Sequence, residues 1–347
     1  MSVTNQHQED GKTLPQKNFT EELAILRKAL TKVIEKNAEK AERITARYSW
    51  IHVHQAARYI ELLSMNDLEK ILETKPLKTI RTNTLLTTRD RLIKGLEAKG
   101  LLVKEYKPTP YGIIVEHTPI PIGALHEYML GLYAIQGPAS MLAVLAQEPE
   151  QANRVLDMCA GAGIKTTQIA QHNNRAKIIA LDINNRKLLA LKNNLSRLHV
   201  DNVVAINMDA REVPRLGKFD SILLDAPCSG EGLIPYPAKT RPRTIDDILT
   251  RVHLQLQLLD AALSAARKNA TIIYATCSMS FEENEYVINT LLKKRGDFEI
   301  EQPRIPGEPG RTSYAGLRTD PSLARCRRLF PHLHRTEGFT ICKLRKT

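Results

Sequence analysis

Residues 154–167 read RVLDMCAGAGIKTT, and this stretch decides the predicted fold. A short apolar run indicates a strand, the glycines indicate a turn, and a helical pattern follows from Lys165. Gly161 and Gly163 let the backbone approach a ligand closely, and the start of the next helix attracts negative charge. We therefore expect a ligand to bind where this strand ends.

The same alternation of strand and helix continues along the chain. We predict strands at residues 176–183, 202–210, 219–227 and 270–278, and helices at residues 184–198 and 252–268. Apolar runs bounded by helices are typical of a parallel sheet that is covered on both faces. The predicted fold class is α/β, with a doubly wound, mostly parallel, Rossmann-like sheet in a domain over residues 137–347.

Two smaller regions precede this domain. Residues 1–75 are predicted to form a helical region, in which residues 1–18 are polar and expected to be mobile. Its third helix is expected to start at Asn66, with Glu69 at the offset of a capping box. Residues 76–136 show the order β-α-β-β, which predicts a small α+β module, and we expect this module to bind RNA.

Composition limits the class of protein. The 347 residues suit two or three domains, and 50 Lys and Arg against 38 Asp and Glu give a net charge of +12, which favours nucleic acid as a partner. Five cysteines without a CxxC pattern indicate free thiols in a reducing compartment. No apolar stretch approaches the roughly 18 residues of a membrane span. We expect a cytoplasmic protein without a membrane segment or a bound metal.

The glycine turn is compatible with more than one cofactor. A phosphate-binding P-loop is excluded, because Ile164 stands before Lys165 and Cys159 stands where the first glycine is needed. A dinucleotide fingerprint would need glycine in place of Thr166, so an NAD-dependent oxidoreductase remains an open alternative in weakened form. S-adenosylmethionine needs the same close approach of the backbone without a pyrophosphate cradle.

Acidic residues end the next two predicted strands. Asp182 lies 19 residues after Gly163, a spacing that suits a carboxylate bound to ribose hydroxyls, and Asp209 ends the following strand. Both NAD and S-adenosylmethionine contain ribose, so these carboxylates do not separate the two cofactors.

Two cysteines follow two successive strands of the predicted sheet. Asp225 and Cys228 come after the strand at 219–227, and Cys277 ends the strand at 270–278. One helix joins these strands, so they are expected to be parallel and, as neighbours, about 4.8 Å apart, with both thiols at one edge of the sheet. A thiolate that adds to carbon 6 of cytosine makes carbon 5 nucleophilic, and an acid such as Asp225 stabilises the ring charge. The chemistry alone does not say which cysteine attacks.

Five segments resemble motifs of one family, the Sun-type RNA cytosine-5 methyltransferases. In chain order they are RTNTL at 81–85, IQGPASML at 135–142, DAPCSGEG at 225–232, YATCSMSFEENE at 274–285 and RTEGFTICKLRK at 335–346. The resemblance covers residues 76–347. The first cofactor motif departs from the family's CAAPGGKT and reads CAGAGIKT.

The resemblance implies roles for individual residues. Cys277 would be the nucleophile, Cys228 would assist product release, Asp225 would orient the base, and Lys165 would act beside the cofactor. The residues implied to hold S-adenosylmethionine are Cys159, Ala160, Gly161, Ala162, Gly163, Ile164, Lys165, Asp182, Arg186, Asp209 and Asp225. Cys159 would also pack beside this loop. Cys326 and Cys342 would have a structural role or none.

RNA contacts are expected from basic residues near the active-site edge. The expected contacts are Arg81, Lys239, Arg241, Arg243, Arg325, Arg327 and Arg328, with Tyr236 as a stacking residue. We expect methylation of carbon 5 of cytosine in RNA, with tRNA favoured over rRNA. A catalytically silent RNA-binding protein with a vestigial cofactor site remains a further alternative.

Overall fold

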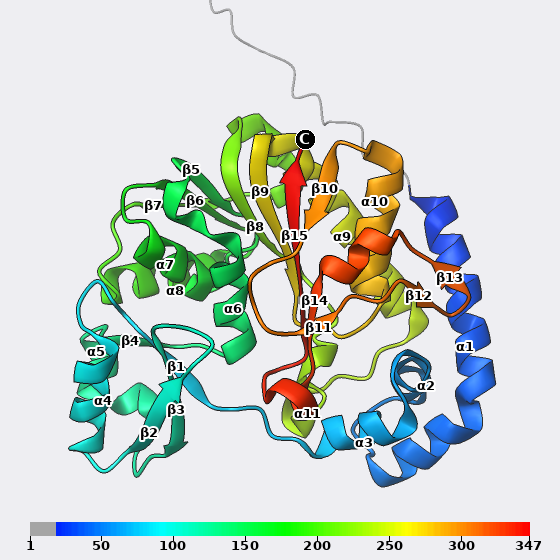
Figure 1. Cartoon of the computed structure of the whole chain (residues 1–347), viewed down its shortest axis with the longest axis horizontal. Coiled ribbons are helices and arrows are strands. Elements are labelled where there is room, and N and C mark those ends of the chain that lie inside the picture. Colours follow the sequence, from blue (N-terminus) through cyan, green and yellow to red (C-terminus); the bar gives the residue numbers. More distant parts are fainter. Residues whose placement is uncertain (1–18) are drawn as a thin grey trace, which may run out of the picture.

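The computed structural model describes residues 19–347, so the expectation made for residues 1–18 lies outside the described range. Figure 1 shows a large α/β domain, with the N-terminal helices and a small sheet-containing module side by side along its lower edge. In residues 19–347 no helix has the length and apolar content that a bilayer crossing requires.

The large domain is built on one twisted sheet. Its parallel strands lie in the order β7, β6, β5, β8, β9, and β15 then pairs antiparallel with β9. The bounds are β5 Arg154–Asp157, β6 Lys177–Asp182, β7 Val203–Asn207, β8 Phe219–Asp225, β9 Ala266–Thr276 and β15 Phe339–Lys346. The predicted fold class, a doubly wound and mostly parallel sheet, is confirmed.

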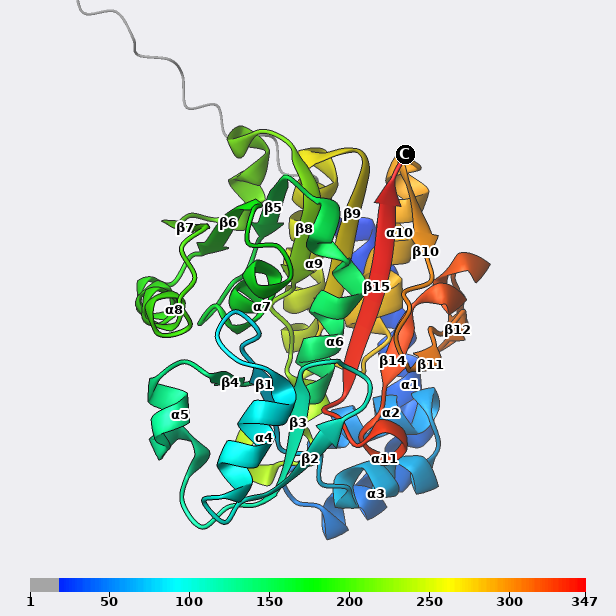
Figure 2. The ribbon, with the colours of Figure 1, turned by 60° about the vertical axis from the view of Figure 1, so that its left-hand side comes forward.

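Helices cover both faces of this sheet because both faces are apolar. Along β8, Leu223 packs into one core while Ile222 and Leu224 pack into the other. Figure 2 shows α6 and α7 on one side of the sheet and α9 and α10 on the other. The bounds are α6 Pro138–Gln147, α7 Ile164–His172, α8 Asn185–Arg197, α9 Ile245–Ala265 and α10 Val287–Arg295.

The N-terminal helices share a core with the large domain. Leu26 and Leu68 belong to the same buried cluster as Leu259 of α9. The bounds of the three helices are α1 Thr20–Arg47, α2 Val53–Leu62 and α3 Met65–Glu73. The predicted start of the third helix was wrong, because Ser64 caps it by accepting a hydrogen bond from the backbone N–H of Asp67.

The small module is a four-stranded antiparallel sheet with its own core. Its strands lie in the order β2, β3, β1, β4, and Ile80, Leu96 and Ile113 pack inside it. The bounds are β1 Thr79–Thr82, α4 Arg89–Glu97, β2 Leu102–Tyr106, β3 Gly112–His117, α5 His126–Met129 and β4 Tyr133–Ile135. The order β-α-β-β is present, and β4 is an addition whose three residues are too few to show a strand period.

The C-terminal segment completes the sheet and was largely unpredicted. Here β10 and β14 pair with β15, and β11 pairs with β14. The bounds are β10 Phe298–Glu301, β11 Glu308–Pro309, β12 Ser313–Tyr314, β13 Leu317–Arg318, β14 Arg327–Leu329 and α11 Pro331–His334. The helix predicted at 252–268 begins earlier, at Ile245, where Thr244 and Asp247 form a capping box.

A disulfide joins Cys326 and Cys342, and the expectation that all five thiols are free was therefore wrong. Cys326 directly precedes β14, and Cys342 lies in β15, which is the antiparallel neighbour of β14. This pairing brings their Cα atoms to 4.4 Å although 16 positions separate them in sequence. Cys159, Cys228 and Cys277 are free.

We predict that denatured, unreduced protein exposes three thiols to titration and that reduced protein exposes five. Cys326→Ala should lower the free energy of unfolding by about 3 kcal/mol, because a cross-link over a loop of this length restricts the unfolded chain. Chemical denaturation of wild type and Cys326→Ala measures this loss of stability. Wild type in reductant serves as the control, and five titratable thiols without reduction would contradict the disulfide.

Candidate active site

A cavity of about 820 Å³ opens at the carboxyl ends of the parallel strands. It contains most of the residues expected to hold the cofactor, together with both expected catalytic thiols. The predicted residues that line it are Cys159, Ala160, Gly161, Ala162, Ile164, Lys165, Asp182, Asp209, Asp225, Cys228 and Cys277. The position of the cavity agrees with the rule that ligands bind beyond the carboxyl ends of such strands.

The glycine turn holds Asp182 toward the cavity. Gly161 adopts a left-handed φ of 58°, and its N–H donates to Oδ2 of Asp182 at 3.0 Å, while the N–H of Asn184 donates to Oδ1 at 2.8 Å. At Gly163, with φ of 78°, a Cβ atom would lie 2.7 Å from Cγ of Leu191. The turn therefore requires glycine here for both backbone conformation and space.

Of the expected cofactor contacts, Gly163 and Arg186 do not line the cavity, whereas Asp209 does. Asp209 lines the cavity, but its carboxylate already accepts hydrogen bonds from the Arg211 side chain, the shortest at 2.6 Å. Arg186 is exposed in the first turn of α8 and is not among the lining residues. Its neighbour Lys187 lines the cavity instead, with Nζ 4.0 Å from Oδ2 of Asp182.

Sequence reasoning missed Asp157, which ends β5 and lines the cavity. Its Oδ2 accepts from Oγ1 of Thr166 at 2.7 Å, while Oδ1 is buried without a partner. Burial raises the pKa of Asp157 to about 7. Its place in the strand RVLD, directly before the glycine turn, was the available signal, but an acid inside an apolar strand is not distinctive by itself.

These features fit S-adenosylmethionine. Met208, Leu254 and Leu258 give the cavity an apolar wall that suits a purine ring, and Asp182 presents its carboxylate for ribose hydroxyls. The unpartnered Oδ1 of Asp157 offers an acceptor to the cationic groups of the methionine part.

The two thiols meet at the edge of the sheet. Cys228 follows β8 and Cys277 follows β9, and their Sγ atoms lie 2.8 Å apart. The expectation that neighbouring parallel strands bring them to one edge is confirmed. The hydrogen bond with the Cys277 sulfur, and then burial, raise the pKa of the Cys228 thiol.

A half-buried ion pair lies beside the thiols. Nζ of Lys165, from the first turn of α7, lies 2.7 Å from Oδ2 of Asp225 at the end of β8. Burial lowers the pKa of the Lys165 ammonium, but the nearby Asp225 carboxylate outweighs this and leaves the pKa raised. The ammonium also lies 5.6 Å from the ring centroid of Phe339. Lys165 is therefore a fixed positive charge in the site.

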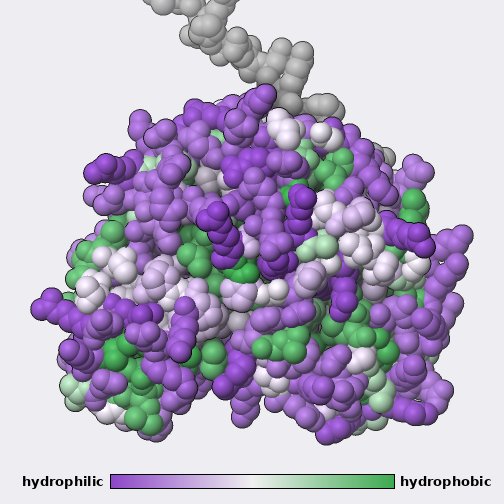
Figure 3. All heavy atoms as spheres, in the orientation of Figure 1, coloured by the Kyte–Doolittle hydropathy of each residue, from purple (hydrophilic) through white to green (hydrophobic). Residues whose placement is uncertain are grey.

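Part of the expected RNA surface is exposed. Lys239 and Arg241 are exposed in the loop between the two cysteines, and Nζ of Lys239 lies 4.7 Å from the ring centroid of Tyr236. Arg243 is half-buried and donates to the carbonyl oxygen of Ser229. Hydrophilic side chains cover most of the molecular face shown in Figure 3.

Two expected RNA contacts, Arg81 and Arg328, are enclosed in the protein, so the prediction that they contact RNA was wrong. Arg81 is buried and donates to Gln136 at 2.6 Å and to the carbonyl oxygen of Ile164 at 2.7 Å, so it supports the cofactor turn. Arg328 is buried in an ion pair with Glu285.

The other two members of the C-terminal basic cluster lie nearer the surface. Arg325 is exposed but donates to the carbonyl oxygen of Ile300, and half-buried Arg327 donates to carbonyl oxygens of its own loop. Both guanidinium groups thus already form hydrogen bonds within the protein.

The fold and the cavity define a methyltransferase of the doubly wound class. Residues 143–345 match the family described as 16S rRNA methyltransferase RsmB/F, and the chain belongs to this family. The family and the cofactor expected from the sequence motifs are thereby confirmed, and the NAD-dependent alternative was wrong.

Individual relatives are similar over most of the chain. The human 28S rRNA (cytosine(4447)-C(5))-methyltransferase is 38% identical over 83% of this chain, which spans only 37% of that protein. The tRNA (cytosine(72)-C(5))-methyltransferase of Pyrococcus horikoshii is 35% identical, covering 78% of this chain and 68% of that protein. A crystal structure of a methyltransferase homologue from Pyrococcus horikoshii superimposes with a TM-score of 0.78, at 34% identity, over 85% of this chain and 95% of that one.

We predict that Asp157→Asn changes how stability depends on pH. The folded pKa of about 7 lies above the ordinary 3.8, so the folded state holds a proton that the unfolded state releases. Wild-type stability should therefore fall by up to about 1.4 kcal/mol per pH unit between pH 4 and 7 from this group, and level off above pH 7. Urea denaturation of wild type and variant from pH 5 to 8 measures the difference.

Exposed Asp201→Asn serves as the matched control, and its pH dependence should follow wild type. Parallel pH curves for wild type and Asp157→Asn would contradict a raised pKa at Asp157.

Proposed function

We propose that this chain methylates carbon 5 of cytosine in RNA with S-adenosylmethionine as the methyl donor. The observation that carries the proposal is the pair of thiols, 2.8 Å apart, on the wall of the cofactor cavity. A cavity that only bound the cofactor would need neither thiol, whereas covalent activation of a pyrimidine uses one as a nucleophile and a second group for release. Both relatives described above carry cytosine-C(5)-methyltransferase in their names.

The raised pKa of the Cys228 thiol supports Cys277 as the nucleophile, because it makes Cys228 the better proton donor. Cys277, whose sulfur lies 2.8 Å away, attacks as a thiolate after its proton has passed to solvent. The Cys277 sulfur bonds to carbon 6, the ring double bond opens, and the electron pair moves toward the ring nitrogen and exocyclic amine. Asp225, held by Lys165, orients the base by accepting a hydrogen bond from its exocyclic amine, and the positive charge of Lys165 stabilises the negative charge that develops on the ring.

S-adenosylmethionine, when bound, would supply an electrophilic methyl group to carbon 5, and its sulfonium S–CH3 bond would break to leave neutral S-adenosylhomocysteine. Release then requires loss of the proton on carbon 5 and cleavage of the bond between carbon 6 and sulfur. Cys228 donates its proton to the departing Cys277 sulfur and takes the carbon 5 proton in exchange. Cys228 ends protonated, as it began, and the proton left on Cys277 returns to solvent, so atoms and charge balance.

We predict opposite outcomes for the two cysteine variants. Cys277→Ala should abolish methyl transfer, by at least about 10³-fold, and should form no covalent RNA adduct, because the nucleophile is missing. In Cys228→Ala, Cys277 should still attack the cytosine, but the methylated RNA should be released slowly. A denaturant-resistant protein–RNA adduct should therefore accumulate. Transfer of labelled methyl groups to RNA and denaturing gels measure both properties.

Cys326→Ala, which alters a cysteine that does not line the cavity, is the matched control; assayed under conditions in which this less stable variant remains folded, it should form no persistent adduct. Normal methylation by Cys277→Ala would reverse the assignment of the two thiols. Cofactor binding by wild type without methyl transfer to any RNA would favour the silent RNA-binding alternative.

We propose tRNA as the first substrate to test and rRNA as the second. The archaeal relative whose length this chain largely spans carries a tRNA name, whereas the human relative with an rRNA name is much longer than the matched region. Separate methylation assays on isolated tRNA and on rRNA distinguish the two, with bisulfite sequencing to locate the modified cytosine.

Lys239 and Arg241 are proposed to contact RNA phosphates at the mouth of the site. We predict that Lys239→Gln combined with Arg241→Gln weakens binding uniformly across RNA sequences and lowers the slope of log K against log salt by about 2. Lys177→Gln with Lys268→Gln is the control, since these exposed residues lie at the amino ends of β6 and β9, away from the cavity. An unchanged slope in Lys239→Gln with Arg241→Gln would exclude the loop that carries these two residues from the RNA surface.

A further inference from the structure

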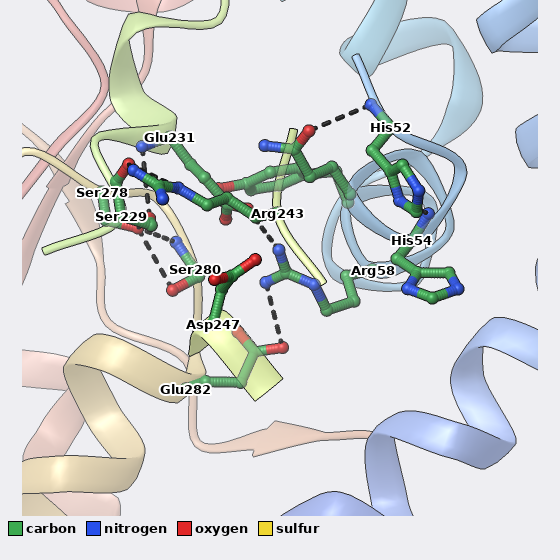
Figure 4. A network of polar contacts seen from close by, with 12 residues as sticks. His52, His54, Arg58, Ser229, Glu231, Arg243, Asp247, Ser278, Ser280 and Glu282 are labelled. Carbon is green, nitrogen blue, oxygen red and sulfur yellow. Dashed lines mark hydrogen bonds and ion pairs between the residues drawn. The ribbon is translucent and has the colours of Figure 1, made fainter. Parts of the chain in front are cut away.

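The loop that carries Cys228 is held by buried polar groups from several parts of the chain. At its two ends, the N–H of Ala226 donates to the carbonyl oxygen of Ala275, and the N–H of Gly232 donates to that of Cys277. Between these points the loop crosses from β8 toward the N-terminal helices. Figure 4 shows the side chains that meet around it, including Arg58 of α2.

Glu283 fixes the middle of the loop from the segment that follows Cys277. Its carboxylate accepts from the backbone N–H of Ser229 at 2.8 Å and from Oγ of Ser229 at 2.6 Å. Nε2 of Gln255 bridges the same carboxylate, at 3.1 Å, and the carbonyl oxygen of Pro227, at 3.0 Å. Both neighbours of Cys228 in sequence are therefore tied to groups outside the loop.

Arg58 fixes the far side of the loop from the N-terminal region. Its guanidinium forms an ion pair with Glu231 and lies 3.4 Å from Oε1 of Glu282, and all three side chains are at most 2% exposed. The hydroxyl of Tyr59 donates to the second oxygen of Glu231 at 2.8 Å. Burial lowers the pKa of Arg58, but the two carboxylates outweigh this and keep the guanidinium charged.

The charges in this cluster depend on Arg58. Glu231 and Glu282 are buried carboxylates that share one guanidinium, and an unpaired buried charge is strongly unfavourable. Removing Arg58 leaves the two acids without a counter-charge, so they must take up protons or move apart. Burial already raises the pKa of Glu282, and either change removes the ion pair that holds the loop against α2. Glu231 lies three positions after Cys228, whereas Cys277 directly follows β9, which pairs with β8 and β15 on its two sides.

We propose that Arg58 is a positioning residue for Cys228, so that the N-terminal helical region sets the product-release step of the catalytic domain through the buried Arg58–Glu231 ion pair. The proposal rests on the proposed cytosine-5 methylation. The proposal predicts different effects on the two thiols, because displacement of the loop moves Cys228 while Cys277 stays in place. Attack on cytosine is then retained and release is slowed.

The test compares full-length wild type, Arg58→Met and Arg47→Met. Methionine keeps much of the arginine stem and removes its charge. Arg47, whose exposed guanidinium pairs with Glu69 and Glu73 in the same N-terminal region, is the matched control. With substrate RNA and S-adenosylmethionine, we measure steady-state turnover and the fraction of protein in a denaturant-resistant RNA adduct.

Arg58→Met should turn over roughly tenfold to a hundredfold more slowly, as expected for a misplacement on the ångström scale, while accumulating the adduct as Cys228→Ala does. Arg47→Met should match wild type in both measurements. Glu231→Gln reaches the same loop from the opposite partner while leaving no unpaired buried acid at that position, and it should also accumulate adduct.

Two outcomes overturn the proposal. Wild-type adduct levels in both Arg58→Met and Glu231→Gln show that the ion pair does not position Cys228. Loss of adduct formation in parallel with turnover shows that Arg58 has only a structural role. The failure of the proposed function looks different, since wild type would then methylate no cytosine and Cys228→Ala would trap no RNA.

Discussion

The parallel pairing of β8 with β9 is the constraint on which the site depends. Asp225 pairs with Ala275 in this ladder, so the residues that follow each strand emerge side by side. Two thiols separated by 48 intervening positions thereby reach contact distance without any local sequence signal joining them. The α9 helix makes this possible, because a right-handed crossover returns the chain to the same edge of the sheet.

The sequence predicts those parts of the site that follow strand ends. Strand periods and glycine positions are local, and they place Asp182, Cys228 and Cys277 at one edge before any coordinates are known. Partners chosen by tertiary packing are not local. Arg81 and Arg328 are basic residues in basic segments, yet each is buried against polar groups more than 40 positions away. Charge patterning cannot separate such residues from exposed ones such as Lys239.

The same reasoning explains the other differences. The disulfide between Cys326 and Cys342 depends on the antiparallel pairing of β14 and β15, two strands whose short or mixed composition gives no clear period. Asp157 was missed because its chemistry comes from burial, which a single acid in an apolar strand does not reveal. Some basic residues form ion pairs inside the protein, as Arg328 does with Glu285, whereas others, such as Lys239, are exposed.

The position of β15 links assembly of the site to the order of synthesis. Residues 339–346 occupy an interior place in the sheet beside β9, and the N–H of Gly338, just before them, donates to the carbonyl oxygen of Gly232 in the Cys228 loop. A nascent chain that has emerged only as far as α10 possesses both thiols but lacks the strand that flanks them. The sheet beside the thiols is thus complete only once residues 339–346 have been synthesised.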